Sequence, residues 1–339
     1  MSRHVALHPA LRVAACVAAV LAAGCGGDGD GGEILPPPPE LVQITAANQV
    51  AVAQAVAVDF WVLDSTGDIP VANGAGAPVS SGANAPVKRA LDAAIATTGR
   101  ALPLATTSIT ETCFAGGSIT ITIDDRDNND TPSAGDVLTT AFNDCRETAT
   151  SLMKGGFTIN FASYSSSQFS GLLTFAQLTL SDEDGTIAMN GPANVVYSET
   201  SLPGSRTERT ELTVASGGLV ASVSTPKYSE TLSHEPGFAG IWTSVTPGTP
   251  TQGYNTAVLN GRVGFASLNG KVVLATDPPV KDMYVDDLAS SGTVLVTGHQ
   301  SKLRLTVLNT TTARLELDAN NDGVYESTRD IPWSELLPF

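Results

Sequence analysis

The arrangement of apolar and polar residues changes near residue 106. From there onward, many short segments carry apolar residues at every second position, which is the pattern of half-buried β-strands. The segments with this pattern are 118–123, 158–161, 172–180, 186–189, 211–214, 220–223, 261–266, 272–275, 293–296, 303–308 and 314–317. Turn-forming Gly, Asn, Asp, Ser or Pro separates most of them. We therefore predict a mainly β domain over 106–339, built as a large antiparallel β-meander in the form of a curved sheet or a partly closed barrel.

Two helices are predicted ahead of the strands, in a helical segment over 43–105. Residues 44–64 contain valines that alternate as in a strand, but the residues between them are mostly Ala, the best helix former. Their length favours a helix of about four turns. In the second helix, Asn84 is suited to cap the start and Gly99 to end the last turn. Apolar residues recur between them at helical spacing, at Val87, Leu91 and Ile95.

The first 24 residues have the layout of a secretion signal. Arg3 and Arg12 supply positive charge, and residues 13–23 form an apolar run that is too short to span a bilayer. This segment ends in Leu21-Ala22-Ala23-Gly24-Cys25. Small residues before a Cys at this place resemble the lipobox of bacterial lipoproteins.

The resemblance implies that residues 1–24 are removed and that Cys25 becomes a diacylated N-terminus held in the lipid bilayer. The next residue is Gly26 rather than Asp, which by the same resemblance favours the outer membrane of the bacterial envelope. Residues 25–42 would then form a tether, flexible where Gly and Asp dominate and stiff where four prolines follow one another. The alternative is an ordinary signal peptide that contains a Cys.

Composition and charge exclude some classes of protein. The chain has 18 Lys+Arg and 34 Asp+Glu, a net charge of −16. Loss of Arg3 and Arg12 with the signal leaves 16 − 34 = −18. A protein that binds nucleic acid through its phosphates needs a basic face, so no nucleic-acid partner is expected. With 42% hydrophobic residues, the chain is also too apolar to be disordered.

The cysteines divide into two groups. Cys16 leaves with the signal and Cys25 carries the lipid, which leaves Cys113 and Cys145 as an even pair in an oxidising compartment. We expect these two to form a disulfide. The alternative, a metal pair, lacks partners, because the only histidines of the mature chain are His234 and His299.

Residues 125–136 carry oxygen-bearing side chains at alternate positions, which suits Ca²⁺ because it takes six to eight hard oxygen ligands. The spacing resembles the calcium loop of EF-hand and dockerin proteins, although Asp130 replaces the turn glycine and the flanks are predicted strands. By that resemblance the ligands are Asp125, Asp127, Asn129, Ser133 and Asp136, with the carbonyl oxygen of Thr131. The loop lies between Cys113 and Cys145, so a disulfide is expected to pin its base. The alternative is a solvated acidic hairpin tip.

A second, weaker metal site is predicted from the spacing D-x-N-x-D-G near the C-terminus. By the same resemblance its ligands are Asp318, Asn320, Asp322 and Glu326. Gly323 keeps the turn glycine, but Arg329 stands where the closing acid should be. An Asp-Gly hairpin turn explains the pattern almost as well.

Signatures of common enzyme classes are missing from the sequence, which has no G-x-S-x-G, P-loop, H-E-x-x-H or dinucleotide fingerprint. His234 beside Glu235 could act as a base with its orienting group. A surface histidine in a turn bounded by Pro and Gly explains it better. Trp61, Trp242 and Trp333 fit core or interface packing better than a sugar-binding platform.

Three functions are compatible with these features. The leading hypothesis is a non-enzymatic, lipid-anchored envelope protein with a structural or interaction role, stabilised by calcium. The alternative is a periplasmic carrier or binding module whose curved sheet holds an apolar ligand. A cavity lined by Phe, Leu and Val would favour the carrier, and a fully packed interior would favour the structural role. A hydrolase, the third hypothesis, requires a pocket in which acids converge with His234 or His299.

Overall fold

The computed structural model describes residues 40–65, 107–129, 132–146, 148–165, 167–183, 185–248, 252–286 and 288–337. All of them belong to the compact unit that runs from Pro39 to Phe339. The signal segment, Cys25, most of the tether and the second predicted helix lie outside the described residues. Strands make up 62% of the described residues and helices 8%, which confirms the prediction of a mainly β protein.

The elements follow one another in a simple order. Helix α1 (Gln49–Ser65) comes first, seventeen strands follow, and the short helix α3 (Trp333–Leu336) ends the described chain. The strands are β1 (Thr107–Thr112), β2 (Gly116–Asp124), β3 (Val137–Arg146), β4 (Leu152–Tyr164), β5 (Gln168–Ser181), β6 (Thr186–Leu202), β7 (Ser205–Val214), β8 (Leu219–Ser224), β9 (Ser229–His234), β10 (Ala239–Pro247), β11 (Tyr254–Phe265), β12 (Gly270–Thr276), β13 (Val280–Met283), β14 (Gly292–Gly298), β15 (Ser301–Asn309), β16 (Thr312–Asp318) and β17 (Ser327–Pro332).

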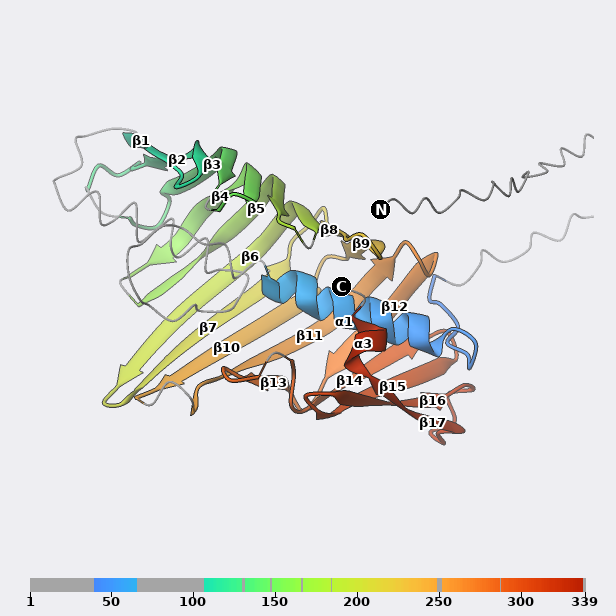
Figure 1. Ribbon diagram of the computed structural model, residues 1–339. Coiled ribbons are helices and arrows are strands. Elements are labelled where there is room, and N and C mark those ends of the chain that lie inside the picture. Colours follow the sequence, from blue (N-terminus) through green and yellow to red (C-terminus); the bar gives the residue numbers. More distant parts are fainter. Residues whose placement is uncertain are drawn as a thin grey trace, which may run out of the picture. The chain divides into compact units, whose positions relative to one another are not determined.

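The strands form one antiparallel sheet (Figure 1). From β1 to β7 each strand pairs with the next, and β7 pairs with β10. The ladder continues through β11, β12, β14, β15 and β16 to β17. Within the described residues β1 pairs only with β2 and β17 only with β16, so the sheet is open there. The predicted antiparallel meander is therefore confirmed.

Interruptions in neighbouring strands follow one line across the sheet and bend it. β7 and β8 both pair with β6, on either side of residues 215–218, and β9 and β10 both pair with β11, on either side of residues 235–238. Gly191 in β6 and Gly261 in β11 lie on this line with φ of 125° and 120°. A Cβ would come within 2.4 Å of the Gly218 carbonyl oxygen and 2.7 Å of the Phe238 Cα, respectively. Glycine is therefore required at both bends.

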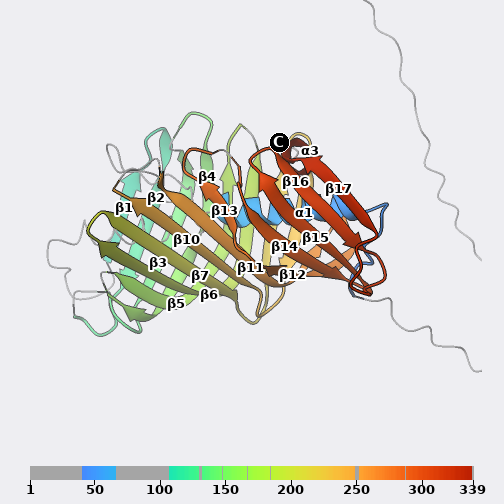
Figure 2. The same cartoon turned by 90° about the horizontal axis from the view of Figure 1, so that it is seen from below.

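Helix α1 is apolar on all sides and packs against this bent sheet. Val52, Val56, Val58 and Val62 have no exposed surface, and the helix contacts β8, β11, β15 and β16 as well as α3. In the view from below (Figure 2), strands of the sheet pass in front of α1. A helix that is apolar all round is expected to be buried, and burial on several sides stabilises α1 more than its own propensity does. The first predicted helix is confirmed. Among the described residues, no helix is long and apolar enough to cross a membrane.

Candidate functional site

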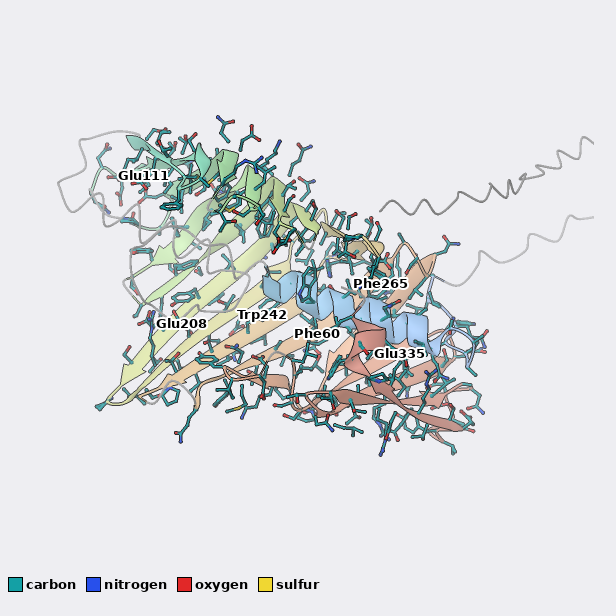
Figure 3. All side chains as sticks on the ribbon, viewed as in Figure 1. Phe60, Glu111, Glu208, Trp242, Phe265 and Glu335 are labelled. Carbon is teal, nitrogen blue, oxygen red and sulfur yellow. A yellow bond between two sulfur atoms is a disulfide. The ribbon has the colours of Figure 1, made fainter. Side chains whose placement is uncertain are left out.

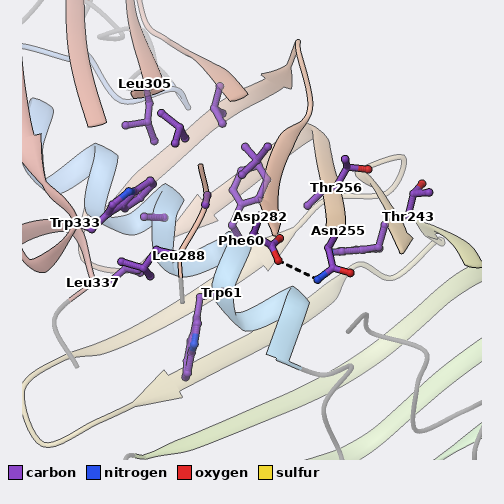
Figure 4. Close-up of a pocket in the computed structure, with 17 residues that line it drawn as sticks. Phe60, Trp61, Thr243, Asn255, Thr256, Asp282, Leu288, Leu305, Trp333 and Leu337 are labelled. Carbon is purple, nitrogen blue, oxygen red and sulfur yellow. Dashed lines mark hydrogen bonds between the residues drawn. The ribbon is translucent and has the colours of Figure 1, made fainter. Parts of the chain in front are cut away.

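An apolar cavity of about 190 Å³ lies between α1 and the sheet (Figure 4). Helix α1 contributes Phe60 and Trp61, and the C-terminal segment contributes Trp333. The full lining is Ala57, Phe60, Trp61, Trp242, Thr243, Asn255, Thr256, Ala257, Val280, Asp282, Leu288, Ala289, Val294, Leu305, Val307, Trp333 and Leu337. Ligand sites in proteins are typically lined in this way, by apolar and aromatic side chains with a few polar groups.

Two rows of side chains on one face of β10, β11 and β13 lie on the sheet side of the cavity, and all of them except Ser244 line it. Trp242, Ala257 and Val280 lie directly opposite one another in the first row. Two residues further along, Ser244, Asn255 and Asp282 form the second row. Because side chains two residues apart point to the same face of a strand, both rows face α1. Phe60 of α1 and Trp242 of β10, both labelled in Figure 3, line the cavity from the helix and from the sheet.

Hydrogen bonds account for only some of the polar groups in the second row. Asn255 Nδ2 donates to Asp282 Oδ2 at 2.9 Å, drawn as the dashed line in Figure 4. The Ser244 hydroxyl lies 2.5 Å from the hydroxyl of Tyr284. By contrast, the buried atoms Asn255 Oδ1 and Trp242 Nε1 have no hydrogen-bond partner among the described residues.

All three tryptophans of the chain line this cavity. Trp242 and Trp333 are buried, as core packing predicts, and both also line the cavity. Trp333 Nε1 donates to the Asn309 carbonyl oxygen at 3.2 Å. The corresponding N–H of Trp242 has no hydrogen-bond partner among the described residues. The cavity itself was not visible in the sequence, because its lining comes from segments more than 250 residues apart.

The first acidic loop connects β2 to β3 and brings its carboxylates together. Asp125, Asp127 and Asp136 each offer an oxygen, and these oxygens lie within 4.8 Å of one another. Asp136 is fully buried and Asp125 is nearly so. The Ser133 hydroxyl donates to Asp127 Oδ2 at 2.9 Å and to Asp136 Oδ2 at 3.1 Å, and Asn129 Nδ2 donates to Asp127 Oδ2 at 2.8 Å. The donor set of clustered carboxylates with a hydroxyl and an amide fits a hard cation. Thr131 lies outside the described residues.

Backbone N–H groups also stabilise this loop. Asp136 accepts from the N–H of Arg126 at 2.9 Å and of Ser133 at 2.7 Å, while Asp125 Oδ1 accepts from the N–H of Asn129 at 3.2 Å. These bonds offset part of the repulsion among the three carboxylates, since an N–H dipole stabilises negative charge. The loop is therefore shaped by its own backbone around the acidic cluster.

Cys113 and Cys145 form the predicted disulfide, with their Cα atoms 5.4 Å apart. The expectation that it would pin the base of the acidic loop is wrong. In the β2–β3 hairpin, Asp124 pairs with Val137 next to the loop, whereas Gly116 pairs with Arg146 at the opposite end, where the disulfide lies. The pairing of β2 with β3, and not the disulfide, holds the base of the loop.

The second acidic loop, between β16 and β17, also collects its carboxylates. Oxygens of Asp318, Asp322 and Glu326 lie within 4.8 Å of one another, and Asp318 is fully buried. Asp318 accepts from the N–H of Asp322 at 3.1 Å and of Gly323 at 2.9 Å, and Asn320 Nδ2 donates to Asp322 at 3.1 Å. Arg329, at the position of the missing closing acid, pairs instead with Glu335 at 3.0 Å.

A buried polar pair that the sequence did not indicate joins α1 to the sheet. His234 Nε2 lies 2.8 Å from Asp59 Oδ1, and neither side chain has exposed surface. His234 Nδ1 lies 3.3 Å from the Leu219 carbonyl oxygen, and the Phe238 ring packs on the imidazole at 4.4 Å between centroids. The surface turn expected for His234 is therefore wrong. Its partner is 175 residues away in sequence, so only the fold could reveal the pair.

The hydrolase hypothesis required acids to converge with a histidine in a pocket. The cavity lining contains one carboxylate, that of Asp282, and neither His234 nor His299. No family model, curated protein or solved structure matches the chain. The protein is therefore described by its structure alone. A helix is buried against a bent antiparallel sheet, and an apolar cavity lies between them.

Proposed function

We propose that this protein is a non-enzymatic binding module for a small apolar ligand at the bacterial cell envelope. One observation carries the proposal: the cavity between α1 and the sheet is lined mainly by aromatic and aliphatic side chains. A packed interior would have favoured a purely structural role. An apolar cavity of roughly 150 Å³ is able to hold a molecule of the size of benzene. The cavity of about 190 Å³ therefore suits a single ring with a short substituent.

Methylcyclohexane is a suitable probe, because it is apolar and does not absorb where tryptophan is excited. We expect it to change the tryptophan fluorescence, since all three tryptophans line the cavity, and to raise the melting temperature.

Ala57→Leu, which adds three carbon atoms to a lining residue of α1, should weaken binding roughly tenfold, about the cost of displacing two methylene groups. Ala51→Leu on the exposed side of the same helix is the matched control. Absence of binding, or equal binding by both variants, would leave the structural or interaction role as the better hypothesis.

A lipid on Cys25 is the second part of the proposal, supported by the lipobox-like residues 21–25. Two acyl chains suffice for stable anchoring, and the acidic, proline-rich tether would hold the folded domain away from the outer membrane. Replacement of Cys25 by Ser should move the protein from the membrane fraction to the soluble envelope fraction. Unchanged retention in the membrane fraction would contradict the anchor.

Calcium in the two acidic loops is the third part, supported by the convergence of carboxylates in each. Asp125, Asp127, Asn129, Ser133 and Asp136 would hold the ion in the first loop, and Asp318, Asn320, Asp322 and Glu326 in the second. Bound Ca²⁺ would neutralise the clustered charge, and so stabilise two hairpin connections at once. At ten times its dissociation constant, one bound ion would add about 1.4 kcal/mol to the free energy of unfolding.

The variant Asp127→Asn gives a test in which the sign of the effect depends on calcium. With chelator present we expect the variant to be as stable as the native protein or more stable, because one of three neighbouring carboxylates is neutralised. With millimolar Ca²⁺ it should be less stable than the native protein, because a ligand is weakened. Asp124→Asn is the control, since Asp124 pairs with Arg126 at 3.1 Å outside the cluster. Melting curves that do not respond to calcium would refute the metal sites.

A further inference from the structure

We propose that the ligand of the cavity is a small organic cation, an apolar ring with an ammonium group that is recognised by the carboxylate of Asp282. This inference rests on the proposed function and adds the chemical class of the ligand. Among the lining residues that the structure describes, Asp282 is the single ionisable side chain, and Lys, Arg and His are absent. A charged group on the ligand would therefore be enclosed together with a carboxylate. In a site of low dielectric constant this favours a cation and opposes an anion.

The carboxylate of Asp282 is held in place on the cavity wall by its neighbour. Asn255 lies directly opposite in β11, and its Nδ2 donates to Asp282 Oδ2 at 2.9 Å (Figure 4). Asp282 is half-buried, so its carboxylate is neither a surface group nor sealed in the core. A carboxylate has about four acceptor sites on its two oxygens, so it can accept from a ligand ammonium in addition to its bonds within the protein. Hydrogen bonds of this charge-assisted kind are stronger than neutral ones.

The lysine that precedes Asp282 in the sequence does not share its face of the sheet. Successive side chains of a strand point to opposite faces, so Lys281 and Asp282 lie on opposite sides of β13. Lys281 Nζ lies 4.0 Å from the centroid of the Tyr254 ring. Tyr254 is in turn the residue before Asn255 in β11, and it lies on the same far face. The positive charge of Lys281 is therefore directed away from the cavity.

The polar row that contains Asp282 continues across the sheet as a negatively charged band. Directly opposite residues extend it from β13 to β6, in the order Asp282, Asn255, Ser244, Glu208 and Glu199. Arg206 Nη2 lies 2.8 Å from a carboxylate oxygen of each glutamate, so one guanidinium serves two carboxylates. Burial and the two glutamates hold the pKa of the Tyr197 hydroxyl above its usual range. The electrostatic potential on this face of the sheet is therefore negative, which attracts a cation towards the cavity.

The aromatic part of the cavity suits the remainder of such a ligand. Its lining includes the four aromatic side chains Phe60, Trp61, Trp242 and Trp333. They provide apolar surface for a hydrocarbon ring, and aromatic rings also attract a cation that lies over them. The volume of about 190 Å³ limits the ligand to one ring with a short substituent. The ligand class is therefore a small alicyclic or aromatic amine in its protonated form, and not a fatty acid.

Three probes of similar size separate charge from shape. Methylcyclohexane is neutral, cyclohexylammonium (cyclohexylamine at neutral pH) carries a positive charge, and cyclohexanecarboxylate carries a negative charge. Dissociation constants would be measured by tryptophan fluorescence for the native protein, for Asp282→Asn and for the matched control Asp286→Asn. In Asp282→Asn the new amide oxygen can still accept from Asn255 Nδ2, so the change removes the charge and keeps this bond. Asp286 follows on the same segment but does not line the cavity, so its replacement removes an equal charge outside it.

The ratio of cyclohexylammonium affinity to methylcyclohexane affinity is the decisive quantity, because binding of methylcyclohexane shows that the cavity of each variant is intact. We expect this ratio to fall roughly tenfold in Asp282→Asn, the loss of one charge-assisted hydrogen bond, and to stay nearly constant in Asp286→Asn. In the native protein, cyclohexylammonium should bind roughly tenfold or more tightly than cyclohexanecarboxylate.

An unchanged ratio in Asp282→Asn would overturn the inference, and so would an equal fall in both variants, which would reflect the overall charge of the protein. Equal binding of the cation and the anion by the native protein would overturn it as well. In each of these cases, binding of methylcyclohexane would still support the proposed function. If the native protein binds none of the three probes, the proposed function fails together with the inference.

Discussion

Replacement of His234 by Leu should lower the free energy of unfolding by about 3–5 kcal/mol, because it leaves the buried Asp59 side chain without its hydrogen-bonding partner. The buried side chain of Asp59, on helix α1, would then lose its imidazole partner. Asp59 Oδ2 already has no hydrogen-bond partner among the described residues, and Oδ1 faces His234 at 2.8 Å. The cost therefore comes from the stranded carboxylate more than from the lost imidazole contacts.

The double variant Asp59→Leu with His234→Leu distinguishes this cause from a simple packing defect. When both polar groups are replaced by apolar side chains of similar size, no buried charge is left unpaired, and much of the lost stability should return. Urea unfolding of the two single variants and the double variant gives the coupling energy. His299→Leu, at a half-buried position, should cost roughly 1 kcal/mol or less. Equal losses in the single and double variants would show that packing alone is involved.

The pair also explains how an apolar helix is held in one position. Apolar contacts alone would allow α1 to turn about its axis or slide, because it is apolar on all sides. Asp59 is the acidic residue in the middle of this helix. Its bond to His234 in β9, together with the bond that Gln54 Nε2 donates to the Glu335 carbonyl oxygen at 3.3 Å, opposes rotation and sliding of α1. This placement in turn directs Phe60 and Trp61, the next two residues, towards the cavity. The stability of the pair and the shape of the cavity are therefore linked.

Most of the strands that the sequence predicted have aliphatic or aromatic residues at their inward positions. The period-two segment at 118–123 lies in β2, where Ile119, Ile121 and Ile123 are buried. Strand β9 was not predicted, because its buried positions include Glu230 and His234 next to Leu232. Glu230 is satisfied there by Tyr228 and Ser267. A hydrophobic pattern cannot detect a strand whose inward side chains are polar, since their partners come from other parts of the chain.

β10 shows the same limit for the candidate site. Its inward residues are Gly240, Trp242 and Ser244, which do not form an aliphatic alternation. Trp242 and Asn255 come onto one wall of the cavity only through the register of β10 with β11, and no local signal specifies that register. The acidic loops differ, because their clustered carboxylates lie within 12 residues of one another and a short connection between paired strands brings them together. Local spacing therefore predicted the acidic clusters but not the cavity.

Removal of the disulfide, by Cys113→Ala with Cys145→Ala, should lower the free energy of unfolding by about 3–4 kcal/mol, as expected from the chain entropy of a loop of this length. The effect should be concentrated at the edge of the sheet, because Cys113 follows the edge strand β1 and Cys145 lies at the end of β3. Hydrogen exchange should therefore increase most in β1 and in the adjoining end of the β2–β3 hairpin. A reducing agent should bring the native protein to the stability of the variant and leave the variant unchanged.

The same variant should leave calcium binding by the first acidic loop nearly unchanged. The disulfide and the loop lie at opposite ends of the hairpin, and the paired residues from Ser118 with Asn143 to Asp124 with Val137 separate them. If the variant bound calcium clearly more weakly than the native protein, the pairing of β2 with β3 would be too weak to hold the loop by itself. The loop would then depend on the disulfide across the whole hairpin. Equal calcium affinity in native protein and variant would instead show that Asp125, Asp127 and Asp136 are positioned by the β2–β3 ladder and by the N–H groups of their own loop.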